Sequence, residues 1–158
     1  KVKLYLSLGS NSGDRKKNIE TALSLFFLFL GTPYKAVSSF IETEPWGFES
    51  VNSFLNAVVL IDTTLSPQVC LKMAKAIERE MGRSYTKCGY EDRIIDVDIL
   101  MYDSEVVDDE DLKIPHALMH LREFVLKPLA ELAPNLVHPV LNKTMEDLLS
   151  DLQKKETK

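Results

Sequence analysis

The segment that most constrains this chain is residues 93–102, Arg-Ile-Ile-Asp-Val-Asp-Ile-Leu-Met-Tyr. Its β-branched and apolar content predicts a strand, and the side chains of a strand alternate between two faces. Asp96 and Asp98 therefore share one face, about 6–7 Å apart along the strand, and the apolar residues between and beside them face the core. Two carboxylates at this spacing can converge on hard cations, which prefer oxygen ligands.

The acid pair also has a simpler interpretation, in which both carboxylates lie on a half-exposed edge strand and contact only water. Two features favour a site instead. The flanking residues are strongly apolar, and Arg83, Lys87 and Arg93 lie in the eleven residues before the strand. Because Mg²⁺ usually binds through one or two carboxylates plus substrate phosphates, acids beside cations predict a metal–polyphosphate site.

Length and charge narrow the class of protein. A chain of 158 residues suits one domain with a real core, and we expect residues 1–158 to form a single domain. The net charge of −5 argues against nucleic-acid binding over a broad basic surface. The longest apolar run, Leu25 to Leu30, is too short to span a membrane.

The two cysteines, Cys70 and Cys88, are too few for a disulfide framework, which predicts a reducing cytoplasmic location. We interpret Cys70 as a core residue and Cys88 as an exposed loop thiol.

Hydrophobic periodicity predicts alternating strands and helices. Asp14 is the expected N-cap of a heavily covered helix, and Ser66-Pro67 open a second helix that Gly82 ends. The predicted elements are strands at 2–8, 35–43, 54–62 and 93–102, and helices at 15–30 and 67–81. The order β-α-β-β-α-β predicts an α+β, ferredoxin-like split sandwich with both helices on one sheet face.

The remaining residues predict a helical and hairpin appendage. Residues 103–111 carry six acids in nine positions and favour a solvated turn or hairpin over a second metal site. A helical stretch follows, which we expect Pro128 to break or kink. Thr144 begins a last helix that extends to about Leu152.

Several short motifs occur in a specific order along residues 2–152. They are Gly9-Ser-Asn11, Phe54-Leu-Asn-Ala-Val58, Glu78 with Gly82-Arg83, Arg93-x-x-Asp-x-Asp98, Ile114-Pro-His116 and Arg122-x-Phe124. Together they closely resemble the 6-hydroxymethyl-7,8-dihydropterin pyrophosphokinase family of folate biosynthesis. The resemblance implies an enzyme that transfers the β,γ-diphosphate of ATP to the pterin hydroxymethyl group and releases AMP.

The resemblance also implies roles for individual residues. Asp96 and Asp98 would hold two Mg²⁺ ions, and with Arg83 and Arg93 they would form the catalytic set. The residues implied on the ATP side are Glu78, Arg83, Tyr90, Arg93, Ile99, His116 and Arg122. Those implied on the pterin side are Gly9, Thr43, Glu44, Trp46, Phe54, Asn56 and Phe124. ATP and a pterin are thus the expected partners of a monomer, and no residue is assigned as general base.

These roles agree with the chemistry of the residues. Phosphoryl-type transfer needs in-line positioning and charge neutralisation, which metal ions and arginines supply. A flat pterin with polar edges suits aromatic rings and an amide. We further expect ATP with Mg²⁺ to order residues 83–92 over the phosphates, which amide exchange with and without nucleotide would test.

This chain departs from better-known family members at several positions. Tyr90, Glu91 and Asp92 replace a Trp-Gly-Pro run before Arg93, and Tyr85 replaces a second arginine. Asp111, Ala117 and His120 stand where Arg, Tyr and Lys occur in some relatives, and Phe54 replaces a Tyr. The loss of cations predicts weaker ATP binding or altered binding kinetics, unless Lys87 substitutes for them.

Two other classes fit parts of the pattern. A ferredoxin-like binding module without catalysis explains the topology but not the convergence of two acids and two arginines. A metal-dependent nucleotidyl or phosphodiester enzyme explains the acids, but it usually has a basic nucleic-acid surface.

Overall fold

The computed structural model describes residues 1–43, 53–82 and 94–156. Its strands are β1 Val2–Ser10, β2 Ala36–Val37, β3 Ile41–Thr43, β4 Phe54–Thr63, β5 Asp96–Tyr102, β6 Val107–Asp108 and β7 Lys113–Ile114. Its helices are α1 Arg15–Leu30, α2 Pro67–Glu80, a 3₁₀ turn at Met119–Leu121, α3 Glu123–Leu132 and α4 Met145–Glu156.

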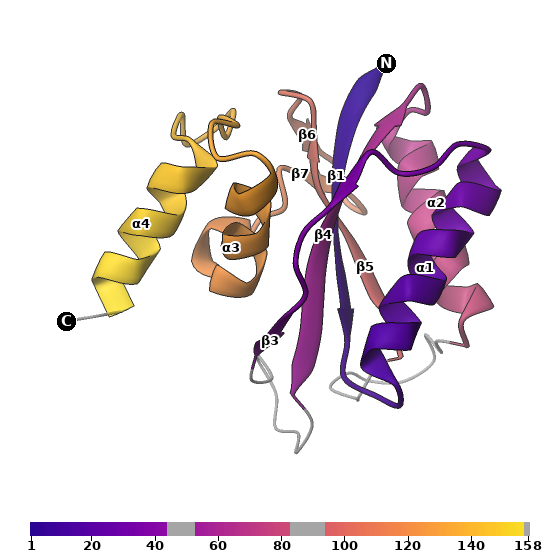
Figure 1. Cartoon of the computed structure of the whole chain (residues 1–158). Coiled ribbons are helices and arrows are strands. Elements are labelled where there is room, and N and C mark those ends of the chain that lie inside the picture. The colour runs from indigo at the N-terminus through magenta and orange to yellow at the C-terminus, as the bar shows by residue number, and fades with distance from the viewer. Residues whose placement is uncertain (44–52, 83–93, 157–158) are drawn as a thin grey trace.

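One antiparallel sheet organises these elements (Figure 1). Its strand order is β2-β4-β1-β5, with β3 also paired to β4. The long β1–β4 ladder runs from Val2 opposite Thr63 to Ser10 opposite Leu55. Each βαβ unit therefore has a third strand inserted between its two strands, which is the split ferredoxin-like arrangement. The predicted fold class is confirmed.

Alternation along the strands divides the core into two layers. Leu4, Leu6 and Leu8 of β1 point toward α1 and α2 and belong to the larger cluster of buried apolar residues. Tyr5 and Val58 point to the opposite face, where α3 and α4 cover them in a second cluster. Figure 1 shows the two helix pairs on opposite sides of the sheet. The C-terminal appendage thus supplies a second helical layer.

Local signals in the sequence set the helix boundaries. The Asp14 carboxylate accepts a hydrogen bond from the Lys17 N–H at 3.1 Å, and Gly31 ends α1 with a φ of 75° that favours glycine. Ser66 caps α2 in the same way. Burial raises the pKa of the Cys70 thiol to about 11, as expected for the core residue predicted there.

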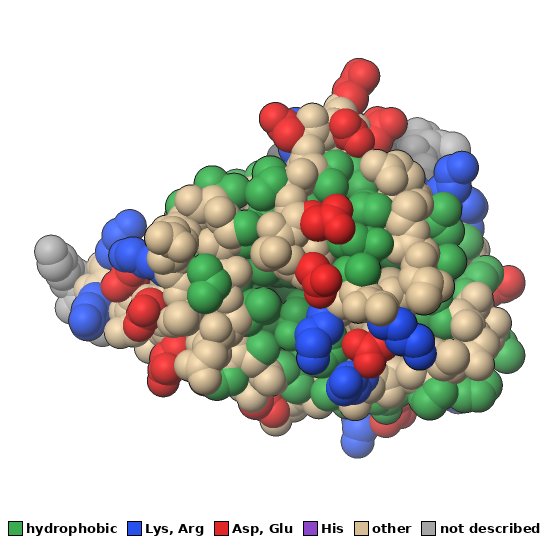
Figure 2. Space-filling model, turned by 90° about the horizontal axis from the view of Figure 1, so that it is seen from above, with side chains coloured by type: hydrophobic (Ala, Val, Ile, Leu, Met, Phe, Trp, Pro, Cys, Tyr) green, Lys and Arg blue, Asp and Glu red, His purple; other side chains and the backbone are tan. Residues whose placement is uncertain are grey.

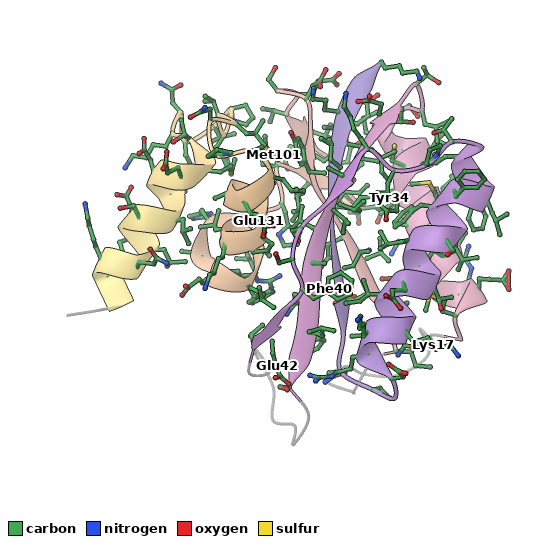
Figure 3. The ribbon with its side chains drawn as sticks, in the orientation of Figure 1. Lys17, Tyr34, Phe40, Glu42, Met101 and Glu131 are labelled. Atoms are coloured by element: carbon green, nitrogen blue, oxygen red, sulfur yellow. The ribbon has the colours of Figure 1, made fainter. Side chains whose placement is uncertain are left out.

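Two predictions about local structure were wrong. The strand expected at 35–43 is two strands, because the Ser39 N–H and hydroxyl donate to the carboxylate of Glu131. Figure 3 labels Glu131 on α3. Phe27, Leu28 and Phe29 are 48%, 74% and 48% exposed, since a helix on one sheet face buries only one stripe.

Pro128 was expected to break or kink its helix, and it does not break it. It lies inside the continuous α3, where it is buried on the apolar face of the helix. The acid-rich segment, by contrast, forms the predicted hairpin through β6 and β7. Among the described residues, no helix is long and apolar enough to cross a membrane.

Candidate active site

The centre of the candidate site is a row of three residues on neighbouring strands. Gly9 of β1 lies opposite Asn56 of β4 on one side and opposite Asp96 of β5 on the other. Directly opposed residues point to the same sheet face, so Asn56 and Asp96 face the same side about 10 Å apart. Ser7 lies opposite Asp98, which places the second carboxylate on this face as well.

Gly9 keeps the space between the amide and the carboxylate open. A Cβ atom at this position would lie 2.8 Å from Asn56 Oδ1 and 3.6 Å from Phe54 Cδ1. Any larger residue would therefore push the Asn56 amide or occupy the space beside it. The glycine is required by close approach and not by a special backbone angle.

Asn56 is a buried amide with an unused donor. Its side chain is 4% exposed, and among the described residues its Nδ2 atom has no hydrogen-bond partner. A buried polar group without a partner costs about 1–3 kcal/mol, so such groups are rare unless a ligand satisfies them. This observation makes the Asn56 side of the row a candidate binding surface for an acceptor atom.

A cleft of about 560 Å³ lies along the edge of β5, within the size range of small-molecule sites. Six residues assigned to the metal or the nucleotide line it, namely Glu78, Asp96, Asp98, Ile99, His116 and Arg122. Val97 and Ile99 point to the α2 face, whereas Asp96 and Asp98 point to the α3 face. The cleft therefore bends around the edge strand and connects the two faces.

Glu78 holds this edge strand in place. The residue is 3% exposed, and its carboxylate accepts a hydrogen bond of 2.7 Å from the N–H of Val97, which lies between the two aspartates in the sequence. In the described structure β5 pairs only with β1, so this N–H points outward from the sheet. A hydrogen bond from a backbone N–H to a charged carboxylate is among the stronger hydrogen bonds in proteins.

Two basic side chains approach the aspartates from the α3 side. Burial lowers the pKa of Arg122, and the nearby carboxylates of Asp98 and Asp96 oppose that shift. Burial and Arg122 likewise lower the pKa of His116, with Asp96 acting in the opposite direction. The His116 Nδ1 atom accepts a 3.2 Å bond from the Leu118 N–H, so neutral His116 carries its proton on Nε2 and can donate it.

The described residues assigned to the pterin, Gly9, Thr43, Phe54, Asn56 and Phe124, are not among those that line this cleft. Thr43 pairs with Phe54 at the ends of β3 and β4, on the same face as Asn56. Phe124 lies in the first turn of α3, and the Arg122 guanidinium lies 5.6 Å from its ring centroid. This contact joins the nucleotide side of the site to the pterin side.

The donor set fits Mg²⁺ bound together with phosphates. Within residues 1–43, 53–82 and 94–156, no group of three or more His, Cys, Asp or Glu side chains could hold a metal ion alone. If Mg²⁺ binds here, Asp96 and Asp98 would be its ligands from the described residues, and substrate oxygens would complete the coordination. This is the usual manner of Mg²⁺ binding at ATP sites.

Several predicted site residues lie outside the described residues. They are Glu44, Trp46, Arg83, Tyr90 and Arg93, and the departures at Tyr85, Glu91 and Asp92 lie there too. Two other departures, Asp111 and Ala117, line the cleft. Asp111 thus adds a carboxylate where some relatives carry an arginine.

Sequence reasoning missed part of the cleft wall. Leu71 and Lys75 of α2 line it beside Glu78, and Leu112 and Lys113 of the hairpin line it from the opposite side. The α2 residues were detectable, because positions 71, 75 and 78 share one helix face. The hairpin residues carry no such signal.

Comparison with known proteins agrees with this geometry. The model of the 7,8-dihydro-6-hydroxymethylpterin-pyrophosphokinase (HPPK) family matches residues 5–134. A 2-amino-4-hydroxy-6-hydroxymethyldihydropteridine pyrophosphokinase of Porphyromonas gingivalis is 47% identical over 139 residues, covering 86% of this chain and 93% of the relative. The folic acid synthesis protein fol1 of Schizosaccharomyces pombe is 43% identical over 148 residues.

Solved structures show the same fold within longer chains. An HPPK-DHPS crystallised with substrates has a TM-score of 0.79 at 15% identity, over 98% of this chain. The Plasmodium falciparum HPPK-DHPS A437G structure has a TM-score of 0.78 at 19% identity, also over 98% of this chain.

These relatives differ in length. The chain spans 44% and 46% of the two HPPK-DHPS structures and 20% of the S. pombe protein, where it covers 94% of its own length. The family match and the identity to the P. gingivalis protein are sufficient to assign the family. The chain belongs to the 7,8-dihydro-6-hydroxymethylpterin-pyrophosphokinase family.

Proposed function

We propose that this chain transfers the β,γ-diphosphate of ATP to the hydroxymethyl group of 6-hydroxymethyl-7,8-dihydropterin, giving AMP and the pterin diphosphate for folate synthesis. The observation that carries the proposal is the row Asn56–Gly9–Asp96. In this row, the Asn56 amide, proposed to bind the pterin, and the Asp96 carboxylate, proposed to act at the phosphates, point to the same sheet face. Gly9 leaves the space between them open. The family and the named relatives support the same reaction.

The edge of β5 suits the nucleotide. Leu71, Ile99 and Leu112 give this part of the cleft an apolar wall against which a purine ring can lie. Alternation along β5 turns the N–H of Ile99 outward, to the same side as the Val97 N–H. An edge strand can thus hydrogen-bond the polar edge of the base through its backbone, while His116 and Arg122 lie nearer the aspartates.

Asp96 and Asp98 would hold two Mg²⁺ ions together with the ATP phosphates. When bound, Mg²⁺ neutralises phosphate charge and aligns the transferred group. Arg83 and Arg93 would donate to phosphate oxygens, a role carried by the family resemblance. Arg122 adds a third guanidinium near the same carboxylates, and it orients the ATP side without transferring a proton.

The pterin would lie over Gly9. Asn56 Nδ2 would donate to an acceptor on the pterin edge, which satisfies the unused donor, and Phe54 and Phe124 would contact the ring faces. Thr43 lies beside Phe54, and Glu44 and Trp46 would complete this side. Positioned in this way, the hydroxymethyl group would point along β1 toward Asp96.

Phosphorus NMR of a reaction with ATP, Mg²⁺ and the pterin tests the reaction directly. AMP together with a pterin diphosphate is the expected result. ADP would indicate an ordinary kinase, and no turnover would favour a binding module. A separate titration with Mn²⁺, a spectroscopic substitute for Mg²⁺, should show ions that bind in the presence of a non-hydrolysable ATP analogue and are lost in Asp96→Asn.

We also propose a monomer located in the cytoplasm. The small number of cysteines supports the location, because it does not suggest an exported protein. Light scattering coupled to gel filtration gives the mass in solution, and a dimer mass would overturn the monomer.

A further inference from the structure

One arginine at the start of α1 joins the ends of two strands. The Arg15 Nη1 atom lies 2.8 Å from Glu42 Oε2 in β3. The same nitrogen donates to the backbone oxygen and to the hydroxyl of Ser53, each at 3.0 Å, immediately before β4. The Ser53 hydroxyl in turn donates to Glu42 Oε2 at 2.7 Å. We call this closed set of contacts the Arg15 clamp.

The clamp lies on the opposite sheet face from the pterin residues. Glu42 pairs with Leu55, whereas Thr43 pairs with Phe54 and Ile41 pairs with Asn56. Because neighbouring residues of a strand point to opposite faces, Glu42 faces α1 while Thr43 faces the site. Figure 3 shows Glu42 at the lower end of β3, near the start of α1. Arg15 therefore cannot act on the pterin except through the strands.

The first turns of α1 also hold the end of β1. The Asn18 amide donates to the Ser10 hydroxyl at 3.1 Å and to the Ser12 backbone oxygen at 2.8 Å. Ser10 directly follows Gly9, the glycine between Asn56 and Asp96. One helix end thus fixes the ends of β1, β3 and β4, which are the three strands that carry the assigned pterin residues of the sheet.

We propose that Arg15 is a positioning residue for the pterin side of the site. This inference rests on the proposed function, since it takes the residues beside the clamp to bind the pterin. The two clamp side chains are 30% and 58% exposed, so their ion pair contributes little to global stability. Its effect is local, because it fixes how closely β3 lies to β4 at Thr43 and Phe54.

The test compares four variants with the wild-type enzyme in steady-state kinetics. Arg15→Ala should raise the KM for the pterin by about five- to tenfold, since small misplacements of binding groups are costly, and leave the KM for ATP within about twofold. Arg15→Lys and Glu42→Gln should show smaller increases, because each keeps part of the clamp. Lys17→Ala removes one charge from the same exposed turn (Figure 3) and should change neither constant.

Two results would overturn the inference. A pterin KM within twofold of wild type in Arg15→Ala would show that the clamp does not position the slot. Equal increases in both KM values, or a fall in kcat alone, would indicate general loosening of the fold. If Arg15→Ala does not fold, Glu42→Gln decides by the same criteria. Absence of turnover in the wild type would instead refute the proposed function, so the two failures remain distinct.

Discussion

Polar side chains gather at both ends of the sheet, but they are held in different ways. At the end carrying Gly9, the amide of Asn56 is buried and its Nδ2 has no partner among the described residues. At the other end, seen from above in Figure 2, acidic side chains lie exposed beside lysines and arginines. There Asp103 accepts from the Lys3 N–H at 2.8 Å, and Asp108 pairs with Lys113.

The difference shows why a count of acids does not locate a site. The hairpin segment has six acids in nine residues. Of these, Asp108 forms a surface ion pair and Asp103 accepts a hydrogen bond from a backbone N–H. At the site end, Asp96 and Asp98 lie on one face of a strand whose edge lines a cleft. Partial burial, a shared direction and the nearby Arg122 guanidinium distinguish the second group.

The largest expected effect on activity comes from removing a carboxylate at the site end. Asp98→Asn should lower kcat/KM by about 100- to 1,000-fold, because a metal ligand contributes several kcal/mol to charge neutralisation in the transition state. Asp108→Asn, at the hairpin end, is the matched change and should leave kcat/KM within about twofold. Coupled detection of AMP measures both, and a comparable loss in the two variants would refute the distinction.

The second prediction separates function from stability at Asn56. Asn56→Leu should raise the pterin KM by about 100-fold, since the site loses its hydrogen bonds to the ligand. The same change should leave the free energy of unfolding equal or raise it by about 1 kcal/mol, because an unpaired buried donor disappears. Urea denaturation measures the free energy of unfolding of both proteins. A large loss of stability would mean that Asn56 is a structural residue.

The third prediction concerns a buried polar group that has its partners. His138 is 5% exposed, and its Nδ1 accepts from the N–H groups of Val140 at 3.2 Å and Leu141 at 3.1 Å. Burial and His120 lower its pKa, so the folded state binds a proton less readily than the unfolded state. Its contribution to stability is therefore complete above the unfolded pKa of about 6.5 and declines as pH falls.

His138→Asn keeps an acceptor near the Nδ1 position but cannot titrate. The decline below about pH 6.5 should be shallower than in the wild type by up to about 1.4 kcal/mol per pH unit. Denaturant unfolding at several pH values measures the difference, and activity at neutral pH should not change. Parallel pH profiles would show that His138 does not titrate on unfolding.

The smallest expected effect is a gain in function, not a loss. It concerns Asp111, the hairpin acid that lines the cleft. Asp111 lines it with Asp96 and Asp98, where some relatives carry an arginine. Asp111→Asn removes repulsion toward the ATP phosphates and should lower the KM for ATP by about two- to threefold. An unchanged or higher KM would show that Asp111 does not face the phosphates.

Local signals were enough for much of the fold. Capping at Asp14 and Ser66, the helix stripes and the strand alternation each act within a few residues, so they can be read without a structure. The same holds for the shared face of Asp96 and Asp98. Predictions failed where distant groups decide, as at Ser39, which turns toward Glu131 of α3 and divides a predicted strand.

The sequence by itself determined the order of elements, the caps and the acid pair, because these depend on neighbouring residues. Only the tertiary structure decided that Gly9 lies between Asn56 and Asp96, and that Arg15 joins Glu42 to Ser53. These contacts link positions far apart in the chain, 38 residues apart for Arg15 and Ser53, through strand register and helix docking. Register is set by which whole faces become buried together, and no short window of sequence contains that information.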